Sequence, residues 1–217
     1  MFPAAFRALL EAPHPAFLCK IAAARTSTKR HVAPVRVRLR PAPGPGAARL
    51  LQAVGLAAHD EWRAFFSACN GMQLFVCQVS GRCPLEIYPL KSVPAKTRAM
   101  RRWLALDDFP EIEPIVDPFV LRSALAIGGS ADSSSHLAAA VDGPYAGSIF
   151  HVDHGGTPDG PLANSLAEFL ERAAADPVSL LEAAAAYPRY SDGTTAILWQ
   201  PIAFSSKGVF PDTFAPD

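Results

Sequence analysis

The chain has 217 residues, of which half are hydrophobic, and its 20 Lys and Arg balance 20 Asp and Glu to a formal net charge of zero. A chain of this length can bury roughly 70% of its unfolded surface, so a substantial core is possible. Zero net charge argues against a strong overall field that would draw the molecule to nucleic acid or to an anionic membrane.

The charge is nevertheless unevenly distributed along the chain. Residues 1–50 hold nine Lys or Arg and one acid, Glu11, whereas the other 167 residues hold 11 basic and 19 acidic side chains. The simplest interpretation is a basic N-terminal arm that lies against or near an acidic body. No secretion signal and no uncharged apolar run of 18 residues is evident, and the four cysteines are scattered, so we expect a cytoplasmic protein without a membrane span.

The first predicted elements are a short helix over residues 3–12 and an apolar patch over residues 16–24. Residues 35–40 then alternate strictly, with Val or Leu on one face and three arginines on the other. This pattern predicts a half-buried strand at a sheet edge, because an arginine-covered face discourages unwanted strand addition. The sequence PAPGPG at 41–46 is the best candidate boundary between this extension and the rest of the chain.

A helical region follows this boundary. We expect a short helix over residues 47–54 that stops at Gly55, and a stronger helix over residues 59–69 that ends at Asn70-Gly71. The second helix carries one apolar stripe at i, i+3, i+4 and i+7, formed by Trp62, Phe65, Phe66 and Cys69.

Strands and helices then alternate irregularly. Strands are predicted over 74–79 and 85–90, the second at a sheet edge or an irregularity because Pro84 and Pro89 flank it. A helix over 92–104 precedes an acidic, proline-bearing surface loop at 107–117. Further strands are predicted over 121–127, 136–141, 148–152 and 194–199.

Two helix starts have clear capping signals. Ser165-x-x-Glu168 is a capping box, and Asp176-Pro177 combines an N-cap acid with an N1 proline for a helix that runs to about Tyr187. Together the elements predict an α+β fold, with a mixed, largely antiparallel sheet and helices packed on it.

Five segments carry a resemblance to a known family, in this order: LLQAVGLAAHDEWRAFFSACNGMQLF, LEIYPLKSV, LAIGGSADSSSHLAAAV, GSIFHVDHGG and NSLAEFLER, within residues 50–172. Their order resembles the SUKH superfamily, small α+β domains of fungal cell-wall-assembly regulators and of bacterial immunity proteins that neutralise secreted toxins. In that comparison residues 85–93 resemble the family's edge strand and 125–141 its central hairpin. The chain departs from the family at the turn over 130–135, where members often have a Gly/Asp-rich sequence.

The resemblance implies a SUKH-like domain over 47–175, preceded by a basic extension over 1–46 and followed by a helix, strand and tail over 176–217. It also implies a non-catalytic protein-binding module of the immunity or regulatory type, without a cofactor, that occludes a partner's active surface. An acidic surface would suit a basic nuclease-type toxin. The predicted partner-binding residues are Asp107, Asp108, Glu111, Glu113, Asp132 and Asp142.

Two other functions are alternatives. A metal-dependent hydrolase could use His136, His151 and His154, although on one strand the last two would point to opposite faces. No Gly-x-Ser-x-Gly elbow supports a serine hydrolase, and Gly128-Gly129 lacks the lysine and helix of a phosphate loop. A nucleic-acid-associated regulator could use the basic arm, but that arm lacks interleaved aromatic residues, so its neutralisation by the acidic body is favoured.

Overall fold

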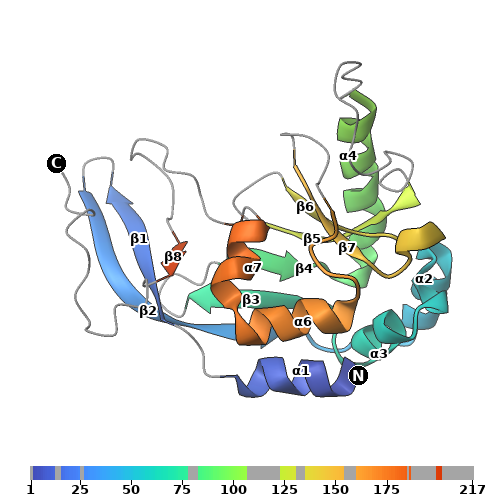
Figure 1. Ribbon diagram of the computed structural model, residues 1–217, viewed down its shortest axis with the longest axis horizontal. Helices are drawn as coiled ribbons and strands as arrows, with labels where there is room; N and C mark the ends of the chain where they lie inside the picture. The colour runs from blue at the N-terminus through green and yellow to red at the C-terminus, as the bar shows by residue number, and fades with distance from the viewer. Residues whose placement is uncertain are drawn as a thin grey trace.

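A computed structural model describes residues 2–12, 16–24, 27–77, 83–106, 123–130, 135–153, 160–184, 186 and 199–201. Within these residues the fold is α+β, and every strand pair is antiparallel, which confirms the fold class predicted from the sequence (Figure 1). None of the helices described is both long and apolar enough to cross a membrane.

The strands form one eight-stranded sheet within the described part of the chain, in the order β7-β6-β5-β4-β3-β2-β1-β8. Strands β2 to β7 are therefore neighbours in both sequence and space. The strands are β1 (Ala16–Ala24), β2 (Ser27–Leu39), β3 (Met72–Cys77), β4 (Leu85–Ile87), β5 (Leu125–Gly129), β6 (His136–Ala139), β7 (Ile149–Val152) and β8 (Trp199–Pro201).

The helices cover the sheet from two sides (Figure 1). Residues of β6 alternate between two apolar clusters: Leu137 belongs to the larger one, shared with α1, α3 and α6, and Ala138 to a smaller one, shared with α4. The α-helices are α1 (Phe2–Glu11), α2 (Ala47–Val54), α3 (Asp60–Ala68), α4 (Val93–Leu106), α6 (Leu166–Ala175) and α7 (Pro177–Ala183), and the 3-10 turns are η1 (Leu56–Ala58), η2 (Leu90–Ser92) and η3 (Gly143–Tyr145).

The aromatic stripe predicted between residues 59 and 69 is confirmed at the centre of the larger cluster. Trp62, Phe65, Phe66 and Cys69 are each no more than 1% exposed. The Phe65 and Phe66 rings meet edge to face at 5.0 Å between centroids, a favoured aromatic geometry. Burial raises the pKa of the Cys69 thiol to about 11, so this cysteine packs as a neutral apolar group.

The N-terminal residues belong to the same core as the rest of the fold. Ala5 and Leu9 of α1 are 2% exposed, and Phe6 meets Phe65 edge to face at 6.2 Å. α1 lies against α6, and β2 pairs with β3 (Figure 1). Residues on both sides of 41–46 are therefore packed into one hydrophobic cluster.

The alternation in β2 is confirmed. Val35 is fully buried, whereas Arg36 and Arg38 are exposed. β2 as a whole lies between β1 and β3, because the apolar patch at 16–24 forms β1. β1 pairs only with residues 27–34 of β2, however, and β3 pairs with residues 35–39. Among the described residues, the alternating segment therefore has a strand neighbour on one side, as predicted for a sheet edge.

The strand that follows Pro84 was predicted at a sheet edge or at an irregularity, and the edge position is wrong. β4 pairs with β3 on one side and with β5 on the other. The strand is only three residues long, so Pro84 and Pro89 lie outside it and remove no donor from the ladder. Tyr88 continues the pairing, because its backbone N–H donates to the Ile127 carbonyl at 2.8 Å.

Both predicted helix caps are confirmed. The Ser165 hydroxyl accepts from the Glu168 N–H at 3.1 Å, and the Glu168 carboxylate accepts from the Asn164 N–H at 2.9 Å. The Asp176 carboxylate accepts from the Ser179 N–H at 3.1 Å. The helix that follows ends at Ala183, four residues before the predicted end. Of the last predicted strand, over 194–199, the structure describes only Trp199, which belongs to β8, and residues 194–198 lie outside the described residues.

Gly71 connects α3 to β3 in a conformation that suits glycine. Its φ is +90°, and a Cβ atom there would lie 2.5 Å from the Ile87 carbonyl oxygen. Gly44 has open space around the same position and no positive φ.

Gly71→Ala should therefore lower the free energy of unfolding by at least about 1 kcal/mol, since backbone strain and a steric clash act together. The matched variant Gly44→Ala should change it by less than about 0.5 kcal/mol. Urea denaturation of both variants measures the difference, and equal stabilities would contradict the tight approach of Gly71 to β4.

Candidate functional site

The face of the sheet that carries α4 is divided into an apolar half and a polar half. Over β5 to β7 it is apolar, and Ala126, Ala138 and Phe150 pack there against Met100 of α4. Over β2 to β4 the same face carries mostly polar side chains, with the buried Val76, opposite Arg36, as an apolar exception. We call this half, with the adjoining His136 and Lys96, the polar face; it consists of Arg36, Arg38, Arg40, Gln73, Glu86, Tyr88, Lys96 and His136.

The strand register aligns the polar face into one transverse row. Arg38 is opposite Gln73, Gln73 is opposite Glu86, Glu86 is opposite Gly129, and Gly129 is opposite His136. Residues directly opposite each other in a sheet project from the same face. Five neighbouring strands thus bring side chains that are almost 100 positions apart in sequence into a single line.

Arg40 and Glu86 form an ion pair on this face, between side chains that are 32% and 20% exposed. The Nε atom of Arg40 is buried and has no hydrogen-bond partner among the residues described. Arg36 and Arg38, on the same side of β2, are exposed. Among the described residues of the polar face, Glu86 is the single carboxylate, and it compensates only part of their positive charge.

Tyr88 and His136 form the buried end of the polar face. The Tyr88 hydroxyl lies 3.3 Å from Nδ1 of His136, and both residues are about 5% exposed or less. Burial raises the pKa of Tyr88, and the negative charge of Glu86 raises it further, so the phenol stays protonated at neutral pH. A Cβ at Gly129 would lie 2.5 Å from this hydroxyl, so the glycine leaves room for it.

The Gly128-Gly129 pair thus has a packing role in β5. A Cβ at Gly128 would lie 2.4 Å from the Glu86 carbonyl oxygen, in the neighbouring strand. Close approach of two backbones is a common reason for glycine within a strand. The geometry at these two positions is that of a strand interior, with β4 on one side and β6 on the other.

α4 borders the polar face and is fixed to the sheet. The Thr97 hydroxyl accepts from the Ala126 N–H at 3.0 Å. One residue earlier, the Lys96 ammonium lies 4.9 Å from the centroid of the Tyr88 ring, within cation–π range. These contacts hold a fourth cation beside the three arginines of β2.

The histidines considered for a metal site are separated by the sheet. His136 is opposite Val152, and His151 is opposite Leu137, so the two imidazoles project from opposite faces. His154 lies outside the described residues. Within the described part of the chain, no three His, Cys, Asp or Glu side chains are grouped as they would be around a metal ion.

Of the six carboxylates predicted to bind a partner, the structure describes only Asp142. Its side chain is exposed and accepts from the Ser123 hydroxyl at 3.0 Å, at the start of η3. The other five lie outside the described residues, namely Asp107, Asp108, Glu111, Glu113 and Asp132.

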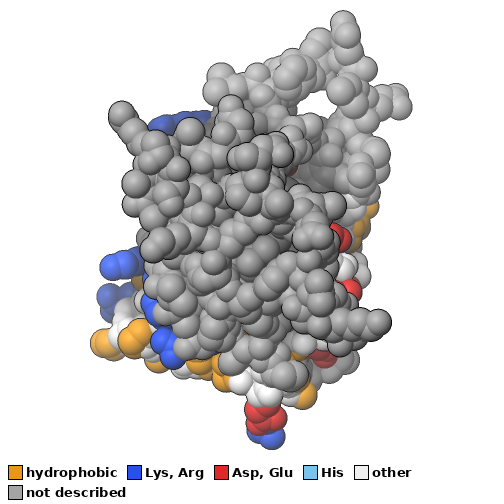
Figure 2. Space-filling model, turned by 90° about the vertical axis from the view of Figure 1, so that its left-hand side faces the viewer, with side chains coloured by type: hydrophobic (Ala, Val, Ile, Leu, Met, Phe, Trp, Pro, Cys, Tyr) orange, Lys and Arg blue, Asp and Glu red, His pale blue; other side chains and the backbone are white. Residues whose placement is uncertain are grey.

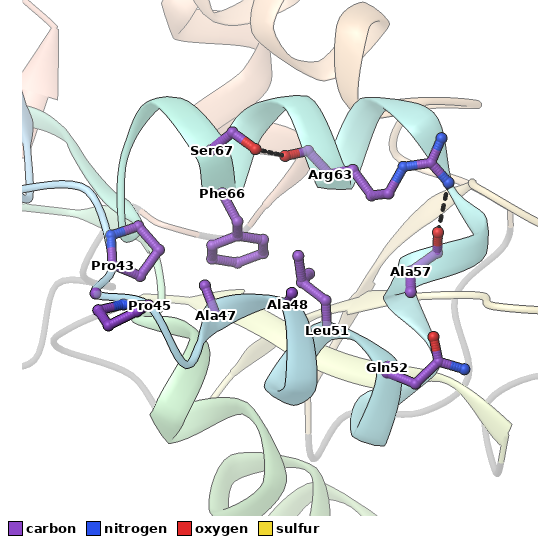
Figure 3. Close-up of a pocket in the computed structure, with 11 residues that line it drawn as sticks. Pro43, Pro45, Ala47, Ala48, Leu51, Gln52, Ala57, Arg63, Phe66 and Ser67 are labelled. Carbon is purple, nitrogen blue, oxygen red and sulfur yellow. Dashed lines mark hydrogen bonds between the residues drawn. The ribbon is translucent and has the colours of Figure 1, made fainter.

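A groove of about 720 Å³ lies between α2, α3 and the loop at 41–46 (Figure 3). The Phe66 ring points from α3 towards Leu51 of α2, and two prolines close one end. At the other end Arg63 donates to the Ala57 carbonyl at 2.6 Å and pairs with Asp60. The groove is lined by Pro43, Gly44, Pro45, Ala47, Ala48, Leu51, Gln52, Ala57, Arg63, Phe66 and Ser67.

The sequence analysis missed both the groove and the polar face. It treated PAPGPG as a boundary, although this loop forms a wall of the groove. The usable signal was the apolar residues of the helix over 47–54 immediately after the loop, since an amphipathic helix needs an apolar neighbour. The polar face depends on strand register, which a single strand pattern does not specify.

Comparison of the chain with protein-family models, with curated proteins and with solved structures finds no match. The SUKH resemblance therefore remains a prediction from the sequence. The α+β architecture and the two surfaces described above come from the structure alone.

His151 gives the fold a specific pH dependence. Its Nε2 atom is buried without a hydrogen-bond partner in the residues described, and burial lowers the pKa of the imidazole below its ordinary value, an effect that Asp153 opposes. A histidine whose pKa is lower in the folded state binds protons better after unfolding. Its contribution to stability is present above about pH 6.5 and is lost as the pH falls towards the folded-state pKa.

The free energy of unfolding should therefore fall between about pH 7.5 and 5.5, and His151→Gln and His151→Leu should both reduce this slope. The two variants differ in polarity, so a shared change of slope isolates the loss of the titrating imidazole from any change in packing. Urea denaturation at several pH values measures it. A slope identical to that of the wild type in both variants would contradict the burial effect.

Proposed function

We propose that the chain is a non-catalytic protein-binding module, and that the groove between α2 and α3 receives an apolar projection of its partner. The groove is the observation that carries this proposal. Its lining is mostly apolar, with Gln52, Arg63 and Ser67 as polar groups. An apolar centre bordered by polar groups is the usual composition of a protein–protein interface.

The walls of the groove are fixed before any partner arrives. α2 ends at Gly55, whose φ is +83° and whose N–H bonds to carbonyls of the last helical turn. α3 is held by its buried aromatic residues, and one of them, Phe66, both packs in the core and lines the groove. A preformed surface loses little conformational entropy on binding, so more of the interaction energy appears as affinity.

Exposed hydrophobic side chains on the adjoining segments favour a protein occupant over a small molecule. Leu39, at the end of β2, is 36% exposed, and Leu50, on α2, is 37% exposed. A small ligand would be enclosed by the groove alone, whereas a protein can also cover apolar residues around it. The occupant that fits best is a loop or helix end with one or two apolar side chains.

The more specific role, an immunity-type or regulatory protein that occludes a partner's active surface, rests on the resemblance to the SUKH superfamily. In this role a rigid surface covers the partner and excludes its substrate. A basic nuclease-type toxin would require carboxylates on the chain, and the exposed side chain of Asp142 is compatible with that requirement.

Blocking the groove tests the proposal. Ala48 is exposed and lines the groove, whereas Ala53 is exposed on the same helix and does not. With a partner isolated from the native host, identified and purified, Ala48→Arg should weaken binding at least about tenfold, or about 1.4 kcal/mol, because the long side chain fills the groove. Ala53→Arg should change the affinity by less than about twofold.

Isothermal titration calorimetry gives both affinities. Equal affinities for the two variants would remove the groove from the interface. Turnover of a small substrate by the purified chain, abolished by Ala48→Arg, would instead show that the groove is an active site and would overturn the non-catalytic assignment.

A further inference from the structure

We propose that the polar face is a second contact surface, which binds an extended acidic segment of the partner protein. This inference rests on the proposed function in one respect, namely that the chain binds a protein. It concerns a different surface from the groove and specifies the chemistry of the partner: carboxylates at alternating positions of an extended chain.

The first observation that supports an acidic partner is the charge of the polar face. Four cations, Arg36, Arg38, Arg40 and Lys96, accompany one carboxylate, Glu86. Glu86 is paired with Arg40, so Arg36 and Arg38 remain the exposed positive charges of β2. An excess of cations on one sheet face attracts an acidic partner and speeds its association.

The second observation, the spacing of the arginines, supports an extended conformation of the bound segment. Arg36, Arg38 and Arg40 are alternate residues, and alternate residues of a strand lie on one side about 6.8 Å apart. A partner segment in the extended conformation has the same repeat. Two carboxylates at alternate positions can therefore meet Arg36 and Arg38, in the bidentate geometry that arginine favours, while Arg40 is paired with Glu86.

The third observation is that the arginines lie on a strand within the sheet. The segment with Arg36 and Arg38 pairs with β3, and the preceding residues 27–34 pair with β1, so these arginines project from a strand that is held in the sheet. Gln73 is directly opposite Arg38 and offers an amide that can hydrogen bond to a peptide group. Lys96 is kept at the border of the face by its contact with Tyr88.

Figure 2 shows the Lys and Arg side chains that it colours mostly along one margin of the view, beside hydrophobic ones, and the coloured Asp and Glu side chains along the opposite margin and at the bottom. The described basic and acidic side chains visible from this side are thus largely separated from each other.

A protein suits this face better than a nucleic acid does. Binding of single strands uses exposed aromatic rings for base stacking, and Tyr88, the aromatic residue of the polar face, is only 4% exposed. Glu86 also places a fixed negative charge within the row of cations. A peptide can present a neutral residue at that point, whereas a nucleic-acid backbone has a phosphate at every nucleotide.

The test uses a fluorescein-labelled peptide of about 12 residues in which Glu and Ser alternate, with the full chain at about 50 mM salt, where charge interactions are weakly screened. Fluorescence anisotropy measures affinity for this peptide, for a peptide of the same composition with all Glu in one block, and for a single-stranded DNA of similar length. The alternating peptide should bind at least about threefold more tightly than either other probe.

Charge reversal locates the binding surface. Arg36→Glu with Arg38→Glu should weaken peptide binding at least about tenfold. Arg7→Glu with Arg49→Glu makes the same change in net charge at exposed positions of α1 and α2, and should change affinity less than about twofold. Glu86→Gln should strengthen binding, because it removes the one negative charge of the face and releases Arg40. Circular dichroism checks that each variant is folded.

Three results would overturn the inference. The first is equal weakening of peptide binding by both double variants, which would indicate a net-charge effect, and the second is unchanged peptide affinity in Arg36→Glu with Arg38→Glu. The third is DNA binding that is tighter than peptide binding and is lost in that same variant. The groove variant Ala48→Arg should bind the peptide as the wild type does. If Ala48→Arg leaves the native partner bound while the arginine variant loses the peptide, the groove assignment fails and the polar face stands.

Discussion

The packing of three aromatic side chains of α3 is the contact on which the rest of the structure depends. Trp62, Phe65 and Phe66 are fully buried against one another and join the core beneath the sheet. Truncating a buried aromatic residue typically lowers the free energy of unfolding by roughly 3–5 kcal/mol. An exposed ion pair such as Arg63–Asp60 contributes about 1 kcal/mol or less to it. The aromatic contacts therefore decide where α3 lies, and with it one wall of the groove. Phe65 also meets Phe6, which ties α1 to the same core.

The sheet has two different faces, and this asymmetry separates stability from recognition. The face towards α1, α3 and α6 holds the larger cluster of buried residues and is largely apolar, with His151 as an exception. Among the described residues, α4 packs on the β5–β7 half of the opposite face. The β2–β4 half is left for charged and hydrogen-bonding groups, which contribute little to folding when exposed but strongly to specificity.

Local patterns in the sequence predicted local structure well. The i, i+3, i+4 stripe of α3, the alternation in β2 and the caps at Ser165 and Asp176 each depend on residues a few positions apart, and the structure confirms all of them. Sheet neighbours are not encoded this way. The strand at 16–24 looked like an apolar patch, so the pairing of β1 with the first part of β2 was not predicted. The row from Arg38 to His136 depends on four strand registers at once, and no single pattern contains them.

The groove and the polar face are joined through one short segment. Arg40 ends the arginine series, and Pro43 already lines the groove. The Arg40 carbonyl accepts from the Asn70 N–H at 3.2 Å, three residues beyond Ser67 in the groove wall. The two surfaces are thus linked by a few residues of chain, although α3 packs on the face of the sheet opposite to the one from which the arginines project. Apolar contact in the groove would slow dissociation, while the cations would orient the approach, a division of roles typical of specific protein interfaces. The segment from Arg36 to Ala48, placed in the sequence analysis at the border of an extension, then becomes the part of the chain that both surfaces share.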